Sequence, residues 1–165
     1  MSMTNKMTNK WDDRKEFYTK MMNLDCKSNP DVLKIMKMCV ENNFYEHFVC
    51  KQILRLYSCK GIKYILRDWG FIIYTNYPAH ENTILIDFLF ILPEHRRKGI
   101  TTKMINIFKK NKDIVIMTID RNNIPMNTCA LKNEFRPIAE CRSEVENFWG
   151  WSDKYDDDYI YEKCY

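Results

Sequence analysis

The chain has 165 residues, enough for one domain with a sizeable core. Apolar residues make up 45% and aromatic residues 14% of it, which excludes a disordered chain. No apolar run approaches the roughly 18 residues of a transmembrane helix, because Asp87 interrupts the most apolar stretch, Ile84–Leu92. Residues 1–10 also lack the apolar region of a signal peptide. We therefore expect a single cytoplasmic domain over residues 1–165, with residues 1–28 as an amino-terminal extension or an extra helix.

The cysteine and histidine residues form no pattern of bridges or metal ligands. Seven cysteines are an odd number, no two of them have C-x-x-C spacing, and the three histidines are scattered. A disulfide framework and a zinc site therefore have little support. We expect reduced cysteines, as in a cytosolic protein, and no metal.

The net charge of +4 is unevenly distributed. Residues 146–165 contain six acidic side chains and two lysines, a net charge of −4, which leaves +8 for residues 1–145. This asymmetry suits a body that binds an anion and a tail that meets a cation. The alternative is an ordinary solvated surface, which is what most charged runs are.

In chain order, the first third of the sequence predicts helices. Asn29-Pro30-Asp31 is a helix start, with proline near the first turn and an acid at the positive end of the helix dipole. Apolar residues at helical spacing follow it and recur at about Tyr45–Tyr57. Trp11–Leu24 is a further candidate helix.

The pattern changes to strands after Gly61. Ile62–Arg67 and Phe71–Tyr77 are rich in β-branched and aromatic residues and are separated by a short turn, which predicts a hairpin. Thr83–Leu92 is apolar almost throughout, as expected of a strand that is buried on both faces.

The remaining elements alternate between helix and strand. Ile100–Lys110 has helical spacing, Ile114–Ile119 predicts a strand, and Pro125–Lys132 predicts a short helix. Phe135–Glu146 predicts a long strand and Tyr159–Lys163 a last one. This order indicates a mixed α/β or α+β layer fold around one sheet.

A phosphate site is predicted where the strand Thr83–Leu92 passes into the helix that begins at Ile100. Three basic residues, Arg96–Lys98, precede Gly99, and two threonines, Thr101–Thr102, follow in the first helical turn. The first amides of a helix lack intrahelical partners and attract anions, and glycine lets an anion come close. Walker A and dinucleotide-binding glycine patterns are absent. The alternative is a basic turn with a capping glycine.

This segment resembles motif A of the GNAT (general-control-related) N-acetyltransferases, whose pattern is Val-x-Pro-x-x-Arg/Gln-x-x-Gly-x-Gly/Ala. Ile91 stands in the Val position, and Pro93, Arg96 and Gly99 match. Thr101 replaces the usual second Gly or Ala.

A later motif of this family, Asn-x-x-Ala-x-x-Leu-Tyr-x-Lys-x-Gly-Phe, follows in the family's order. Three residues match it, Asn123, Lys132 and Phe135, while Met126 takes the Ala place and Cys129 the Leu place. The resemblance covers about residues 62–163. It implies the GNAT-type acyl-CoA N-acyltransferase fold, which has a central mixed, mostly antiparallel sheet flanked by helices.

The resemblance implies direct transfer of an acetyl group from acetyl-CoA, the co-substrate, to a primary amine. The pyrophosphate would lie on the amides of Arg97–Thr102, and the pantetheine arm would pair with the strand edge at Leu89–Ile91. The amide of Ile91 would donate to the thioester oxygen, and Asn123 would contact the pantetheine arm. The residues so assigned to the cofactor are Leu89, Phe90, Ile91, Arg96, Arg97, Lys98, Gly99, Ile100, Thr101, Thr102 and Asn123.

Asp87 is the candidate catalytic base, because a protonated amine with a pKa of about 10 must lose a proton before it attacks. It interrupts an apolar strand and lies four residues before Ile91, so alternation predicts that both side chains share one face. Family members similar to this chain often carry a carboxylate there. The alternative is a structural Asp paired with an Arg or Lys of a neighbouring strand.

The general acid of the family has no counterpart here. The family commonly uses a Tyr to protonate the departing CoA thiolate, and Ala130 occupies that position. Three readings stay open: another residue, such as the adjacent Cys129 or a tyrosine, supplies the proton; solvent supplies it; or catalysis is compromised.

We expect the acceptor amine beside a loop at about Phe148–Asp158, which the resemblance places between the last two strands. Its aromatic and acidic side chains suit a cationic amine, such as a polyamine, an aminoglycoside or a lysine side chain. The alternative is a solvated acidic loop. We expect a monomer or a homodimer with no membrane partner.

Two other functions remain open at this point. The +8 body would suit an acyltransferase directed at nucleic acid, but no nucleic-acid-binding motif supports one. Ala130 would suit a binding or regulatory module that keeps the GNAT fold without catalysis.

Overall fold

The computed structural model describes residues 29–43, 61–78, 80–141 and 145–165. The helices expected at Trp11–Leu24 and Tyr45–Tyr57, and the extension at residues 1–28, lie outside these ranges. Within them, no helix is long and apolar enough to cross a membrane.

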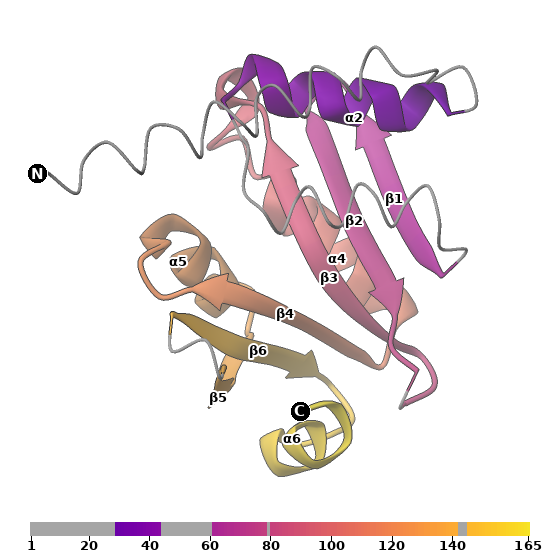
Figure 1. The fold of residues 1–165 in the computed structure, drawn as a ribbon. Coiled ribbons are helices and arrows are strands. Elements are labelled where there is room, and N and C mark those ends of the chain that lie inside the picture. Colours follow the sequence, from indigo (N-terminus) through magenta and orange to yellow (C-terminus); the bar gives the residue numbers. More distant parts are fainter. Residues whose placement is uncertain (1–28, 44–60, 79, 142–144) are drawn as a thin grey trace, which may run out of the picture.

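Six strands of the described residues form one sheet, in the order β1-β2-β3-β4-β6-β5 (Figure 1). Neighbouring strands run antiparallel, except β3 and β4, which run parallel. The sheet is therefore mixed and mostly antiparallel, as expected. The strands are β1 (Ile62–Arg67), β2 (Gly70–Asn76), β3 (Thr83–Ile91), β4 (Ile114–Asp120), β5 (Arg136–Glu140) and β6 (Glu146–Ser152).

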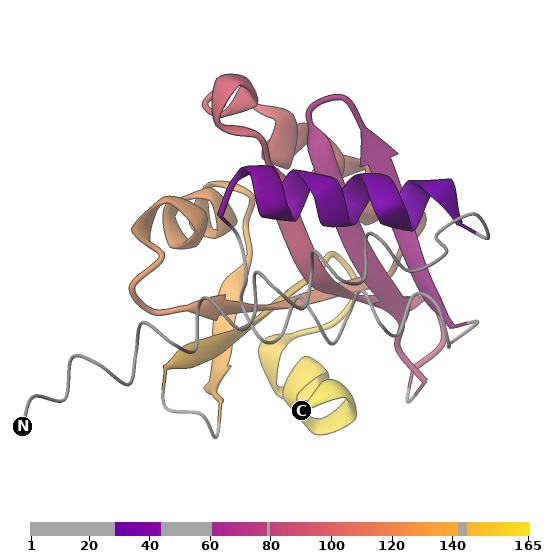
Figure 2. The same cartoon turned by 45° about the horizontal axis from the view of Figure 1, so that its top comes forward.

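Helices cover both faces of this sheet. Consecutive strand residues alternate between the faces, so that Ile72 packs in the cluster beneath α4 and Ile73 in the cluster beneath α2. α5 shares the face of α4, and α6 covers the opposite face at β4 and β6. Figure 2 shows α2 crossing the strands β1 to β3. The helices are α2 (Pro30–Glu41), α4 (Ile100–Asn111), α5 (Ile124–Lys132) and α6 (Asp157–Cys164).

Local sequence accounts for the start of α2. The side chain of Asn29 accepts a hydrogen bond from the amide of Val32 at 3.3 Å, Pro30 occupies the first turn, and Asp31 adds a negative charge there. The helix then buries one apolar face, which includes Ile35. The predicted helix start is confirmed.

The predicted hairpin is also confirmed, and Gly70 explains how its second strand approaches β3. β1 and β2 pair in register from Arg67 opposite Gly70 to Ile62 opposite Thr75. Gly70 has a φ of 142°, and a Cβ at this position would overlap the carbonyl oxygen of Phe90. Only glycine fits here, because the backbone of β3 lies too close for any side chain.

Two predictions for the last third are wrong. The long strand expected at Phe135–Glu146 is instead β5, which ends at Glu140, followed by β6, which begins at Glu146. The strand expected at Tyr159–Lys163 is part of the helix α6. The side chain of Asp156 caps this helix by accepting from the amide of Tyr159 at 2.9 Å.

Candidate functional site

β3 and β4 separate toward their carboxyl ends. They pair only where Thr83–Ile86 faces Ile114–Met117. β3 then continues to Ile91 and β4 to Asp120, and no further pair joins these two described strands, which diverge in Figure 1. The edge of β3 beyond Ile86 can therefore pair with an extended ligand, as an added strand would.

The backbone groups of Leu89 and Ile91 point into this opening. The amide of Leu92 donates to the carbonyl oxygen of Trp69 at 2.9 Å, on the β2 side of β3. Because successive backbone groups of a strand alternate between its two edges, the amides of Leu89 and Ile91 face the β4 side. The carbonyl oxygen of Ile91 also faces that side, where it accepts from Nε of Arg96 at 3.0 Å.

The turn after β3 has the backbone shape of an anion site. A single 3-10 turn, η2 (Pro93–His95), is followed by Arg97 at φ 61° and Gly99 at φ 72°, both in the left-handed region. Left-handed residues within such a turn direct backbone amides toward a common concavity, which favours anions. The first backbone bond of α4 runs from the amide of Lys103 to the carbonyl of Gly99 at 3.0 Å, so the preceding amides stay available.

Gly99 borders open space. A Cβ built there meets no atom within 4 Å, so nothing in the described protein occupies the volume next to it. Its positive φ explains the choice of glycine, and the open side is where a phosphate would approach. The neighbouring side chains of Arg96, Arg97 and Lys98 are exposed and add positive charge.

Arg96 has a second role besides its charge. Its Nε holds the carbonyl of Ile91, five residues earlier, so the side chain ties the turn to the end of β3. The predicted contact with the pyrophosphate therefore falls to its remaining guanidinium donors.

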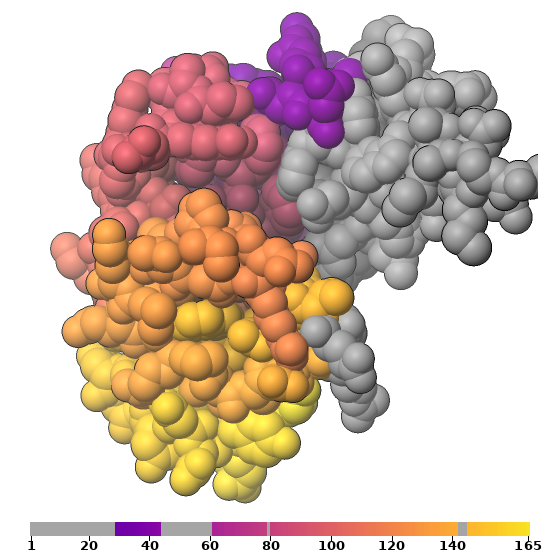
Figure 3. All heavy atoms as spheres, turned by 90° about the vertical axis from the view of Figure 1, so that its left-hand side faces the viewer, coloured from indigo at the N-terminus to yellow at the C-terminus, as the bar shows by residue number. Residues whose placement is uncertain are grey.

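The threonines of the first helical turn differ in environment. Thr101 is half-buried and Thr102 is exposed. The hydroxyl oxygen of Thr102 accepts from Nδ2 of Asn133 at 3.1 Å and lies 3.9 Å from Sγ of Cys129. Thr102 therefore links the start of α4 to the end of α5. Figure 3 shows the pink segment that follows β3 lying directly against the orange atoms of α5.

Asn123 and Ala130 both lie on α5 or at its start. Asn123 is the exposed N-cap, and its Oδ1 accepts from the amide of Met126 at 3.2 Å. Ala130 is fully buried in the cluster beneath α4. The family's Tyr position is thus part of the core here and presents no acid.

Asp87 occupies a β-bulge. Ile73 of β2 lies opposite Phe88, but the next residue, Tyr74, lies opposite Ile86, so Asp87 is the extra residue of β3. β3 is buried at both ends and only half-buried at the bulge, which corrects the expectation of a strand buried throughout.

The bulge changes which side chains share a face. Phe88 and Phe90 pack with the α2 cluster, whereas Leu89 packs with the α4 cluster. By alternation Ile91 lies with Leu89, on the α4 face.

Asp87 lies on the other face. The hydroxyl of Thr75 donates to its Oδ2, and Leu85, which is opposite Thr75 in the ladder, belongs to the cluster beneath α6. The expectation that Asp87 and Ile91 share a face is therefore wrong, because the bulge inserts one residue between them.

The prediction of an acceptor loop at about Phe148–Asp158 is also wrong in part. Phe148, Trp149 and Trp151 are buried side chains of β6, with 6%, 4% and 8% of their surface exposed. They belong to the core and cannot line a loop. Asp156 and Asp157 begin α6, and Asp157 pairs with Arg136.

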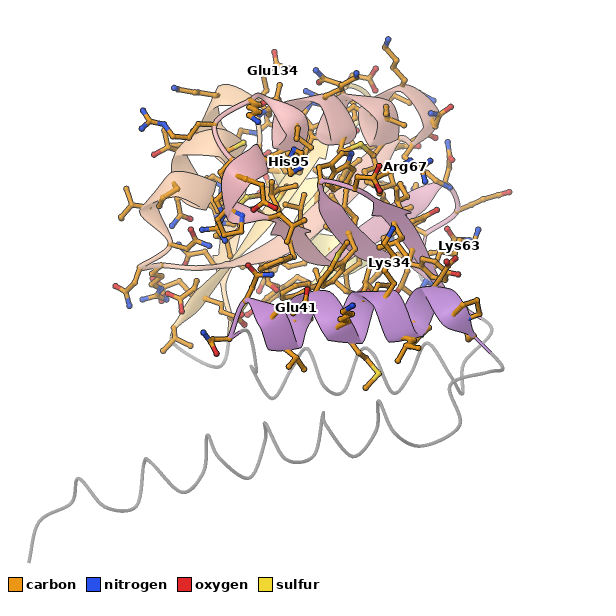
Figure 4. All side chains as sticks on the ribbon, turned by 90° about the horizontal axis from the view of Figure 1, so that it is seen from above. Lys34, Glu41, Lys63, Arg67, His95 and Glu134 are labelled. Carbon is orange, nitrogen blue, oxygen red and sulfur yellow. The ribbon has the colours of Figure 1, made fainter. Side chains whose placement is uncertain are left out.

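Three residues near the site were not predicted. Asn133 and Lys109 connect α5 with α4, and Glu134 lies at φ 64°. Glu134 stands at the Gly position of the second motif, a signal that would have predicted a left-handed backbone. Figure 4 shows it on the far side of the sheet from α2. A hydrogen bond from Lys109 lowers the pKa of Glu134 below its ordinary value.

No group of three or more His, Cys, Asp or Glu side chains within the described ranges is placed to hold a metal.

Comparisons with known proteins found a solved structure that supports the fold. No family model and no curated protein matches the sequence. A proposed GNAT-family acetyltransferase from Desulfovibrio desulfuricans is similar in structure, with a TM-score of 0.55, 12% identity, and coverage of 75% of this chain and 93% of that one. The PaiA N-acetyltransferase of Thermoplasma acidophilum, solved with coenzyme A, has a TM-score of 0.46, 16% identity, and coverage of 72% and 78%.

The divergent β3 and β4, the turn with two left-handed residues between β3 and α4, and the similarity to the Desulfovibrio structure lead to one conclusion. The chain has the fold of the GNAT N-acetyltransferases.

Proposed function

We propose that the chain is an acetyl-CoA-dependent N-acetyltransferase that transfers the acetyl group directly to a primary amine. The observation that carries this proposal is the junction of the open edge of β3 with the turn at Arg96–Gly99. An extended amide-containing arm fits the open edge of β3, and a pyrophosphate fits the turn. CoA combines both in one molecule.

The bulge helps to assign the amide that receives the thioester oxygen. At about 3.3 Å per residue, Ile91 lies roughly 13 Å along β3 from Asp87, whereas Leu89 lies roughly 7 Å away. A base and the reacting carbonyl must be within reach of one amine. We therefore assign the thioester oxygen to the amide of Leu89, in place of Ile91, and pair Ile91 with the pantetheine arm.

In this arrangement Asp87 accepts the proton of the amine. The amine approaches from the α2 face, on which Asp87 lies, and the hydroxyl of Thr75 orients the carboxylate. The amine nitrogen then attacks the thioester carbon, and the negative charge on the oxygen is held by the Leu89 amide. The C–S bond breaks as the carbonyl re-forms, and the second proton of the nitrogen passes to solvent.

Solvent is our candidate to protonate the departing thiolate. Ala130 is buried, and Cys129 lies beside Thr102 at the pyrophosphate end of the site. A thiol with a pKa of about 8.5 is a tolerable leaving group near neutral pH, so catalysis does not require a side-chain acid.

The acceptor remains an amine of unassigned class, and a cationic one would be attracted by Asp87. We infer a cytoplasmic enzyme, since an odd number of cysteines without paired spacing suits a reducing compartment. Whether a small molecule or a protein accepts the acetyl group is for a substrate panel to decide.

The test is release of free CoA thiol from acetyl-CoA with a panel of polyamines, aminoglycosides, amino acids and a lysine peptide. With the best amine, Asp87→Asn should lower kcat by about 100-fold or more, because general-base catalysis contributes about that much. Its affinity for acetyl-CoA should stay unchanged, as should the rate of the control Gly61→Ala, whose Cβ meets no atom within 4 Å.

Equal kcat for wild type and Asp87→Asn would remove Asp87 from the mechanism. If acetyl-CoA binds but no amine releases CoA, the chain is a binding module with this fold, the reading that the buried Ala130 favours.

A further inference from the structure

Asn133 is a polar residue buried in an otherwise apolar core. Within the described residues, the only buried polar side chains are Thr83 and Asn133, and Asn133 is 6% exposed. A buried polar group is tolerated when its hydrogen bonds are made. The partners of Asn133 therefore show what it holds in place.

The side chain of Asn133 joins two helices. Its Nδ2 donates to the carbonyl of Cys129 at 2.8 Å, within α5, and to the hydroxyl of Thr102 at 3.1 Å, in the first turn of α4. The same nitrogen lies 3.6 Å from Sγ of Cys129. One amide group thus closes the end of α5 and reaches the start of α4.

The backbone of Asn133 makes a second contact with α4. Its carbonyl accepts from Nζ of Lys109 at 3.0 Å, and Lys109 also pairs with Glu134 at 2.9 Å and lies 4.4 Å from the ring centre of Trp151. Thr102 and Lys109 are seven residues apart, about 10 Å along a helix. α4 is therefore fixed at two points along its length, and its orientation relative to α5 is fixed with it.

The bond to Thr102 also orients a hydroxyl. Because the oxygen of Thr102 accepts from Asn133, its own proton is left for another acceptor. The protein group within reach is Sγ of Cys129 at 3.9 Å, a weak acceptor that a phosphate oxygen would displace. A chain of bonds from amide to hydroxyl to anion is mutually strengthening. Thr102 is at the third position of α4, where the backbone amide is also available to an anion.

We propose that Asn133 is a positioning residue for the pyrophosphate of CoA, acting through Thr102. It contacts no cofactor itself. It sets the angle of the first turn of α4 and turns the Thr102 hydroxyl into a donor toward the phosphate oxygens. This inference rests on the proposed function, since it requires that the first turn of α4 binds the pyrophosphate.

The experiment compares dissociation constants for acetyl-CoA, measured by calorimetry, across a small set of variants. Asn133→Ala and Thr102→Val should each weaken binding about tenfold, the loss of one charge-assisted bond. Thr102→Ser keeps the hydroxyl and should bind within about twofold of wild type. The double variant Asn133→Ala/Thr102→Val should bind acetyl-CoA no more weakly than the single variant with the lower affinity, because both changes remove the same interaction.

The matched control is Thr83→Val, which removes the other buried polar side chain and its 2.8 Å contact with Nδ1 of His80. It should lower the melting temperature but leave acetyl-CoA affinity unchanged. A second readout uses acetyl-pantetheine, which lacks the pyrophosphate. Turnover of this donor should be equal for wild type and Asn133→Ala.

Wild-type affinity in Asn133→Ala, or a loss no greater than in Thr83→Val, would overturn the inference and leave Asn133 as a structural cap. If Asn133→Ala does not fold, the pair Thr102→Val and Thr102→Ser decides in the same way. Absence of acetyl-CoA binding in the wild type would instead reject the proposed function, and this inference with it.

Discussion

At the scale of single residues, Glu134 shows how a departure from a motif is accommodated. The resembled motif has glycine at this position, and the backbone keeps the left-handed conformation with φ 64° despite the side chain. Most residues avoid this region because Cβ approaches the following carbonyl. Lys109 compensates in part by pairing with the carboxylate at 2.9 Å.

The energetic cost of the left-handed backbone at Glu134 can be measured by comparing the stabilities of Glu134→Gly and Glu134→Ala. Both variants lose the ion pair with Lys109. Glycine adopts φ 64° without strain, so Glu134→Gly should unfold with a free energy about 1 kcal/mol higher than Glu134→Ala in urea titrations. Equal stabilities would show that the left-handed conformation is not maintained.

At the scale of elements, the site depends on how β2, β3 and the turn after β3 are placed. Gly70 lets the backbone of β2 meet β3 near Phe90, next to the residues that face the opening. The bulge at Asp87 brings the carboxylate to the α2 face while Leu89 stays on the other. In the proposed mechanism, the amine and the thioester would therefore approach β3 from different sides.

Gly70→Ala should disrupt this arrangement, because its Cβ would overlap a backbone oxygen that cannot move independently of the sheet. We expect a loss of at least about 2 kcal/mol of unfolding free energy, or roughly 4–8 °C in Tm. Gly61→Ala is the control, since an added Cβ there has open space, and it should melt within about 1 °C of wild type. Similar melting of both variants would contradict the close approach.

At the scale of the whole molecule, local signals predicted most elements. The hairpin, β3, α4, β4 and α5 follow from turn residues and apolar spacing. The order of strand, turn and helix around Gly99 is as predicted, and the binding of an anion there stays a prediction. Two signals were overlooked. Pro137 is typical of an edge strand, which β5 is. Asp156, followed by two further acids, indicates the start of the helix α6.

Other features depend on contacts between distant segments and leave no local signal. The bulge at Asp87 is defined by the register between β3 and β2. Simple alternation of side chains along the sequence therefore predicted the wrong face for Asp87 relative to Ile91. The contact of Asn133 with Thr102 joins residues 31 positions apart. Trp149 and Trp151 suggested a binding loop by composition, but pairing with β4 and β5 places them in the core.

We propose above all that the opening between β3 and β4, together with the turn at Gly99, binds acetyl-CoA. Calorimetric titration of the purified chain with acetyl-CoA, and separately with ADP and NAD, tests it most directly. We expect saturable binding of acetyl-CoA, little or no binding of ADP or NAD, and loss of acetyl-CoA binding in Gly99→Val. Absence of acetyl-CoA binding, or equal affinity for NAD, would contradict it.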